Sequence, residues 1–168
     1  EGLHPLVRMQ TSLGQIVLEL NAELAPITVS NFIQYAEDGF YNGTTFHRVA
    51  ALSGASRPDI VQGGDPLGNG LGGCGEFIDL ENSRLPHEFG VLSMARTDEP
   101  NSATTNFFIL VGTGSHLDGK FAAFGRVTSG MEVVDAINKA PVVEEKPEKP
   151  VRIKKASIQA CSPAPTVQ

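Results

Sequence analysis

The segment that runs Thr44-Thr45-Phe46-His47-Arg48-Val49 places a permanent positive charge among residues that favour β-strands. Side chains alternate between the two faces of a strand, so Phe46 and Arg48 are expected on one face and His47 and Val49 on the other. Arginine keeps its charge and is rarely buried without a partner. Two interpretations follow: Arg48 lies on the solvent face or pairs with an aspartate, or it is a cation held beside an apolar surface.

Upstream of this segment the sequence predicts a hairpin and then a helix. Residues 6–11 and 15–20 alternate apolar and polar side chains around a short turn that contains Gly14. Residues 26–37 place Val29, Phe32, Ile33 and Ala36 on one helical stripe, and Pro26 suits the first turn. A helix over about 26–37 is therefore expected after the hairpin.

Downstream, short apolar runs predict strands separated by turns. These runs are residues 60–62, 90–95, 106–111, 121–127 and 151–158. A second helix is expected at about 130–139, and residues 63–75 and 141–150 are expected to be loops. Seven or eight short strands with two helices favour a closed sheet whose openings are covered by helices. We predict a single domain over residues 1–161 and a disordered tail over 162–168.

Composition limits the class of protein. The chain has 168 residues, of which 40% are hydrophobic, and a formal net charge of −6. An acidic chain argues against a nucleic-acid binder, which needs a basic face, and no run of 18 apolar residues exists to span a membrane. Cys74 and Cys161 cannot make a disulfide framework or a four-cysteine zinc site, so one bridge or two free thiols remain.

Several motifs that carry chemistry are absent or lack their context. Gly68, Gly70 and Gly73 have dinucleotide-motif spacing, but the following residues do not predict the helix that the motif needs. The four histidines are too far apart in sequence to predict a metal site, and no cofactor is expected. The basic residues near the C-terminus alternate with Glu144, Glu145 and Glu148, which predicts a solvated surface.

Taken in order, the motifs resemble those of the cyclophilins, the peptidyl-prolyl cis–trans isomerases, over nearly the whole chain. The Met94-Ala95-Arg96-Thr97 form is similar to the bacterial branch. The segments that carry the resemblance run from Ala25-Pro26 to Tyr41, then Tyr41 to Val49, Val61-Gln62-Gly63-Gly64-Asp65-Pro66, Leu92 to Thr97, Asn106-Phe107-Phe108-Ile109, and Leu117-Asp118-Gly119-Lys120 through Val127.

The resemblance implies a mainly β fold, a closed eight-stranded antiparallel barrel capped by two helices. It also implies Arg-assisted rotation about X–Pro peptide bonds without a covalent intermediate. Arg48 is then the catalytic arginine, and Gln62 orients it and contacts the substrate backbone. The resemblance further implies a substrate-binding set made up of Phe108, Leu117, Ile60, Ala95, Arg96, Thr97, Asn106, His116 and Phe121.

This chain departs from the family pattern near the proline pocket. Asp59 stands where the family has a large Phe, and it could pair with Arg48. The connection over residues 50–58 is about six residues longer than usual, which adds little closure entropy. Asn106 stands where Gln is usual, His116 stands where Trp or Phe is usual, and Phe121 stands where His or Tyr is usual. We therefore expect activity that is weak or tuned to unusual peptides.

The expected partners are proline-containing peptides and unfolded proteins, with the chain acting as a monomer. Cyclosporin binding is a family trait that the Asp59 and His116 changes put in question. The alternative function is a non-catalytic module or chaperone that binds proline-containing segments in the same groove. The first residue is Glu1 and not Met, which favours a periplasmic or secreted protein, with the cytoplasm as the alternative.

Overall fold

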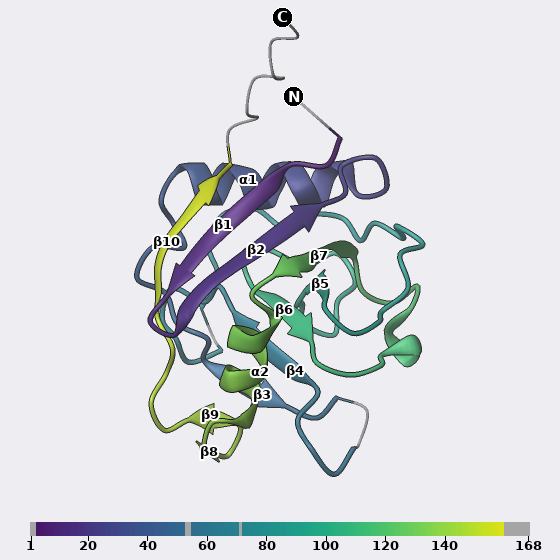
Figure 1. Cartoon of the computed structure of the whole chain (residues 1–168). Coiled ribbons are helices and arrows are strands. Elements are labelled where there is room, and N and C mark those ends of the chain that lie inside the picture. The colour runs from purple at the N-terminus through teal and green to yellow at the C-terminus, as the bar shows by residue number, and fades with distance from the viewer. Residues whose placement is uncertain (1–2, 53–54, 71, 160–168) are drawn as a thin grey trace, which may run out of the picture.

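The computed structural model describes residues 3–52, 55–70 and 72–159, and its centre is one eight-stranded antiparallel sheet that curls strongly on itself (Figure 1). Residues 1–2 and 160–168 lie outside the described part, and with them the predicted tail and Cys161. The strands of the sheet are β1 (Leu6–Thr11), β2 (Gly14–Leu20), β3 (Arg48–Ala50), β4 (Ile60–Gly63), β5 (Val91–Met94), β6 (Phe107–Leu110), β7 (Ala123–Ser129) and β10 (Ile153–Ile158).

The strand order is β10-β1-β2-β7-β5-β6-β4-β3, so β10 and β3 are the two edges of the sheet. The prediction of a closed barrel is therefore wrong: the sheet is an open, strongly curled half-barrel. The two edges meet just before their strands begin, through an isolated bridge between Thr45 and Arg152. The strand β3 spans only three residues, which leaves little edge along which a ladder to β10 could form.

Helix α1 (Pro26–Glu37) confirms the first predicted helix. Its first turn is capped by a distant side chain, because the carboxylate of Glu81 accepts hydrogen bonds from the backbone N–H groups of Ile27 at 3.1 Å and Thr28 at 2.6 Å. An anionic partner at this position satisfies N–H groups that have no acceptor within the helix.

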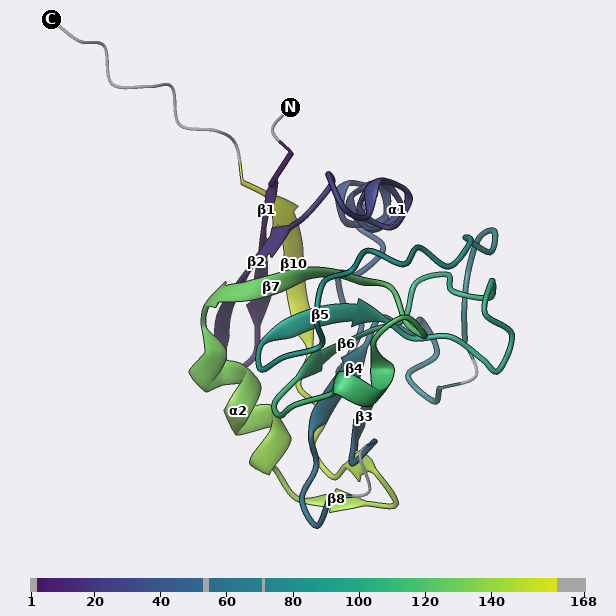
Figure 2. The same ribbon diagram turned by 90° about the vertical axis from the view of Figure 1, so that its right-hand side faces the viewer.

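Helix α2 (Met131–Lys139) confirms the second, and the two helices lie at opposite ends of the curled sheet (Figure 2). Both helices bury apolar side chains in the main core between the helices and the concave face of the sheet. Phe32 of α1 contacts the rings of Tyr41, Phe107 and Phe124, with ring centroids 4.9 to 5.5 Å apart. Val134 of α2 lies in the same core.

The segment predicted as a loop over 141–150 contains a small two-stranded sheet, β8 (Val142–Val143) and β9 (Lys146–Pro147). Glu144 and Glu145 form the turn between them, with φ values of 50° and 67°. Such left-handed angles suit the tight turn of a hairpin but are uncommon for residues with a side chain. Nothing in the charge pattern of this segment indicated a hairpin.

Within the described residues, no helix is long and apolar enough to cross a membrane. The same part of the chain holds no group of three or more His, Cys, Asp or Glu side chains placed to bind a metal ion.

Candidate active site

The site begins with the register of three neighbouring strands. Arg48 of β3 lies opposite Gln62 of β4, and Gln62 lies opposite Phe108 of β6. Because paired residues project to the same face of a sheet, all three side chains point away from the main core. Their neighbours Val49, Val61 and Phe107 point into that core. The register therefore carries Arg48 and Phe108 to the same outer surface.

Phe46 and Arg48 do not share a face, contrary to the expectation from strict alternation. Phe46 lies in the main core, whereas Arg48 points outward with 37% of its side chain exposed. The regular strand β3 starts only at Arg48, and the chain before it is not a continuous strand. The period of two therefore does not extend back to Phe46.

Two side chains hold the guanidinium of Arg48. Its Nη1 donates a hydrogen bond to Oε1 of Gln62 at 3.2 Å, and its Nε donates to Oε2 of Glu145 at 2.8 Å. The first contact is one that the predicted role of Gln62 requires. Arg48 thus has a glutamate from the β8–β9 turn as an acidic partner, whereas the sequence suggests Asp59.

A small apolar cluster covers the outer face beside Arg48. Its buried members are Ala50, Ile60, Phe108, Leu110 and Leu117, and Leu52, Ala95 and Phe121 pack around them. The rings of Phe108 and Phe121 meet edge to face, with centroids 5.9 Å apart. Phe108 is 2% and Leu117 is 5% exposed, so a ligand on this cluster contacts only the outer edges of these two side chains.

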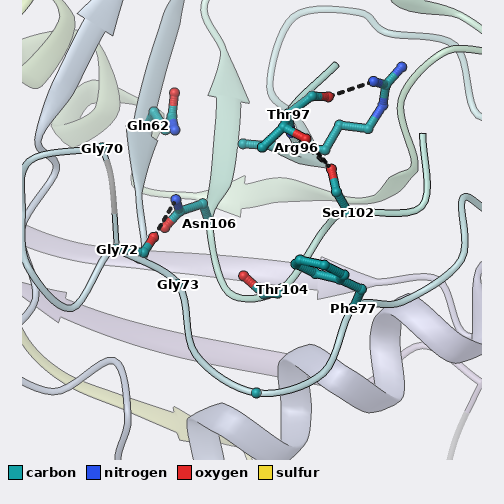
Figure 3. Close-up of a pocket in the computed structure, with 12 residues that line it drawn as sticks. Gln62, Gly70, Gly72, Gly73, Phe77, Arg96, Thr97, Ser102, Thr104 and Asn106 are labelled. Atoms are coloured by element: carbon teal, nitrogen blue, oxygen red, sulfur yellow. Dashed lines mark hydrogen bonds between the residues drawn. The ribbon is translucent and has the colours of Figure 1, made fainter. Parts of the chain in front are cut away.

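Gln62 also lines a groove of about 550 Å³, whose lining residues are drawn in Figure 3. Of the predicted substrate-binding residues, Ala95, Arg96, Thr97 and Asn106 line it together with Gln62. Asn106 extends toward the glycine-rich loop and donates from Nδ2 to the carbonyl oxygen of Gly72 at 3.3 Å (Figure 3). Gln62 therefore borders both the groove and the Arg48 and Phe108 surface, as does Ala95, which also packs against the apolar cluster.

Arg96 is fixed beside the apolar cluster. Its guanidinium lies 4.5 Å from the centroid of the Phe121 ring, and its Nε and Nη2 donate to the carbonyl oxygen of Lys120 at 3.0 and 2.7 Å. A cation over an aromatic face is attracted by the ring. His116 is exposed in the short 3₁₀ turn at Ser115–Leu117 and is not among the residues that line the groove.

The glycine-rich loop is organised around Asp65. The carboxylate of Asp65 accepts hydrogen bonds from the backbone N–H groups of Leu67 at 2.8 Å and Gly72 at 3.2 Å, and from that of Gly70. These contacts lower the pKa of Asp65 although burial opposes the shift. A protein carboxylate thus already occupies the N–H groups that a nucleotide phosphate would need, and no helix follows the glycines at residues 72–75.

Asp59 holds the long connection between β3 and β4. Its Oδ1 accepts a hydrogen bond from the backbone N–H of Leu52 at 2.8 Å, and Leu52 packs against the apolar cluster. The other end of the connection is held by α2, because Nδ2 of Asn138 donates to the carbonyl oxygen of Pro58 at 3.1 Å. The Asp59 carboxylate therefore helps to hold a loop that brings the apolar side chain of Leu52 to the cluster.

Behind Phe108 lies a buried histidine that sequence reasoning did not single out. His87 stacks on the Phe108 ring at 6.4 Å, with its Nδ1 2.8 Å from Oδ1 of Asp118 and its Nε2 2.9 Å from Oγ of Ser93. Burial lowers the pKa of His87, although the Asp118 carboxylate opposes the shift. The order Asp–His–Ser resembles a hydrolase triad, but Ser93 is 0% exposed and cannot reach a substrate.

The sequence did not predict three residues that contact the candidate site, namely Glu145, His87 and Leu52. Glu145 stands in a charged run typical of a solvated surface, and His87 has no neighbour in sequence that indicates its partners. Leu52 belongs to a connection longer than the motif it interrupts. All three act through tertiary contacts, and only the Val-Val and Lys-Pro pairs flanking Glu144 and Glu145 could have suggested a hairpin.

Comparison with known proteins gives one consistent result. The family model described as cyclophilin-type peptidyl-prolyl cis-trans isomerase matches residues 6–158. The chain is 41% identical over 157 residues to the peptidyl-prolyl cis-trans isomerase ppi1 of Schizosaccharomyces pombe, which covers 89% of this chain and 96% of the relative. A peptidyl-prolyl cis-trans isomerase of Helicobacter pylori is 39% identical over 140 residues, or 81% of this chain and 82% of the relative.

Solved structures agree. A crystal structure of a Cryptosporidium parvum cyclophilin-type isomerase superposes with a TM-score of 0.86 at 30% identity, over 95% of this chain and 99% of that one. A structure of that isomerase in the presence of the dipeptide Ala-Pro superposes with a TM-score of 0.84 at 31% identity, over 92% and 99%. With the family model, the relatives and the fold in agreement, this chain belongs to the cyclophilin-type peptidyl-prolyl cis–trans isomerases.

Proposed function

We propose that Arg48 is the catalytic residue of this isomerase. It accelerates X–Pro rotation by donating a hydrogen bond to the prolyl nitrogen of the twisted amide. The observation that carries the proposal is the juxtaposition of a half-buried guanidinium, fixed by Gln62, with the apolar cluster around Phe108. An apolar surface suits the proline ring, and a fixed cation beside it suits the prolyl nitrogen.

The chemistry follows from the barrier. Rotation about a peptide bond has to break its resonance, at about 18–20 kcal/mol. In the twisted amide the prolyl nitrogen recovers its lone pair, so it accepts a hydrogen bond that the planar amide does not. Arg48 donates to this nitrogen more strongly in the transition state than in the ground state, which is the condition for accelerating the reaction. No bond is made or broken, and no proton has to move.

The apolar cluster and the groove bind different parts of the substrate. The proline ring sits against Phe108, Leu117 and Ile60, with Phe121 at the rim, and the preceding backbone lies along the groove edge at residues 95–97. Gln62 and Asn106 offer amide groups to that backbone. The related isomerase structure obtained in the presence of Ala-Pro supports a short X–Pro peptide as a ligand of this site.

The substrates that fit this arrangement are proline-containing peptides and unfolded chains, because the groove is lined by polar side chains such as Gln62, Thr97 and Asn106 that can hydrogen-bond a peptide backbone. Cyclosporin would have to occupy the same surface. His116 in place of an aromatic wall predicts weaker binding of that macrocycle. The Met94-Ala95-Arg96-Thr97 edge supports placing the chain with bacterial family members, and a monomer suffices because the proposed site is built from one chain.

Isomerisation of a short Ala-Pro peptide by the wild type and by Arg48→Ala tests the proposal. We expect the substitution to lower kcat/KM by about a hundredfold, the scale of a lost transition-state donor. The matched control is Arg8→Ala, since Arg8 is exposed on β1, outside the residues that form the site, and donates to Gln159. Equal activity of Arg48→Ala and wild type would refute the role of Arg48. Peptide binding by a wild type that shows no turnover would favour the non-catalytic binding module.

A further inference from the structure

Glu145 contacts β3 in two ways. Its backbone carbonyl oxygen accepts a hydrogen bond from the N–H of Val49 at 2.8 Å, and its carboxylate accepts one from Nε of Arg48 at 2.8 Å. The main-chain bond fixes the β8–β9 turn against the strand that carries Arg48. The carboxylate then has a defined position beside the guanidinium although 51% of the Glu145 side chain is exposed.

The backbone of Glu145 is unfavourable for a residue with a side chain. Its φ is 67° and that of Glu144 is 50°, and two-residue turns with these angles favour Gly and Asn. Strained residues of this kind concentrate at functional sites, where the surrounding structure holds them in place. A glycine at 145 would form the same turn more easily but would leave the Nε of Arg48 without this acceptor.

The two acceptors hold the guanidinium along different edges. Glu145 accepts from Nε and Gln62 accepts from Nη1, so the plane of the group is fixed, while Nη2 has no acceptor among the described residues and can donate to a ligand. Resting on the function proposed above, we propose that Glu145 is a positioning residue of the isomerase site. It orients Arg48 so that Nη2 of the guanidinium faces the prolyl nitrogen.

A positioning role predicts a particular kinetic signature. Loss of Glu145 leaves the apolar cluster and the groove intact, so KM changes little. The guanidinium samples orientations that do not reach the prolyl nitrogen, so kcat falls. An ion pair as exposed as that of Arg48 and Glu145 contributes little free energy. We therefore expect the loss of its orienting effect to lower kcat by only about threefold.

The decisive variant is Glu145→Gly, with Glu144→Gly as its matched control. Both substitutions relieve a left-handed backbone, so both are expected to leave the melting temperature unchanged or to raise it. Only Glu145→Gly removes a hydrogen-bond acceptor of Arg48, so only Glu145→Gly is expected to lower kcat. Glu145→Gln, which keeps an acceptor oxygen without the charge, is expected to fall between Glu145→Gly and the wild type.

A double-mutant cycle separates this role from a general effect on the fold. Glu145→Gly is measured in the wild type and in Arg48→Ala, at enzyme concentrations that give a measurable residual rate. If Glu145 acts through Arg48, its substitution has no further effect once the guanidinium is gone. An equal fractional loss in both backgrounds, or an unchanged kcat in the wild type, overturns the inference. An Arg48→Ala variant as active as wild type would instead overturn the proposed function.

Discussion

The guanidinium of Arg48 and the side-chain amide of Gln62 face each other across β3 and β4, with Nη1 3.2 Å from Oε1. Gln62 is paired on its other side with Phe108. One side chain thus stands between the cation, the apolar cluster and the groove. Gln62 therefore binds Arg48, pairs with Phe108 and lines the groove.

Gln62→Ala is expected to lower kcat about tenfold, the value of a hydrogen bond to a charged group. The reason is that Arg48 loses one of its two orienting contacts and the substrate loses an amide partner. A standard peptide isomerisation assay measures the effect. Gln34→Ala is the control, because Gln34 is an exposed residue of α1 that donates to Asp38 at the end of the same helix. A Gln62→Ala enzyme with wild-type kcat would show that Arg48 does not need this partner.

Arg96→Ala is expected to raise KM severalfold and to leave kcat nearly unchanged. Arg96 covers the Phe121 ring and anchors the carbonyl of Lys120, so its loss loosens the rim of the apolar cluster without touching Arg48. Arg96→Lys should not restore binding, because an ammonium lacks the planar fork that makes both contacts. The split between KM and kcat is the measurement, and a fall in kcat at constant KM would contradict it.

Asp59→Ala is expected to destabilise the fold by about 1 kcal/mol, because the N–H of Leu52 loses its acceptor. Asp59 is 7% exposed, so water replaces that acceptor poorly. Urea unfolding measures the change in free energy. Glu99→Ala provides a control, since Glu99 is an exposed residue of a surface turn. Equal stability of Asp59→Ala and the wild type would mean that the carboxylate does not hold the 50–58 connection.

The buried histidines predict a dependence of stability on pH. Burial lowers the pKa of both His87 and His47 from the usual 6.5. The folded state therefore binds fewer protons than the unfolded state just below that value, and stability falls as pH drops through 6.5 toward the lowered folded-state pKa values. Urea unfolding between about pH 8 and about pH 5.5 measures this slope.

His87→Gln should reduce that slope and leave the remainder to His47. Both ring nitrogens of His47 are buried without a hydrogen-bond partner among the described residues, so charging this ring is also unfavourable. A free energy of unfolding that stays constant over the same pH range in the wild type would contradict the prediction.

Much of the fold could be predicted from local pattern. The stripe of Val29, Phe32 and Ala36 predicts the first helix, because a surface helix buries one face only, and Pro26 predicts where it starts. The hairpin of β1 and β2 followed from alternation around Gly14. Closure of the sheet could not be predicted in this way, since it depends on whether two edges far apart in sequence form a ladder. The β8–β9 hairpin was missed because Glu144 and Glu145 are unusual at its turn.

The proposed site was predictable as far as it follows the motifs. Arg48, Gln62 and Phe108 come together because they share a register, and Ala95, Arg96, Thr97 and Asn106 line one groove. His116 is exposed outside that lining. The partners of Arg48 and Phe108 from distant segments, Glu145 and His87, could not be predicted. Their positions depend on how a hairpin and a loop pack on the finished sheet.

NMR exchange spectroscopy on an Ala-Pro peptide, with the enzyme titrated until the peptide is fully bound, measures two quantities separately. These are the isomerisation rate of the bound peptide and its Kd. For Arg48→Ala we predict an on-enzyme rate lowered by about two orders of magnitude with Kd changed by less than about threefold, because the guanidinium grips the twisted amide and not the planar one. A variant that loses affinity in proportion to rate, or that turns over bound peptide as fast as the wild type, would contradict this role of Arg48.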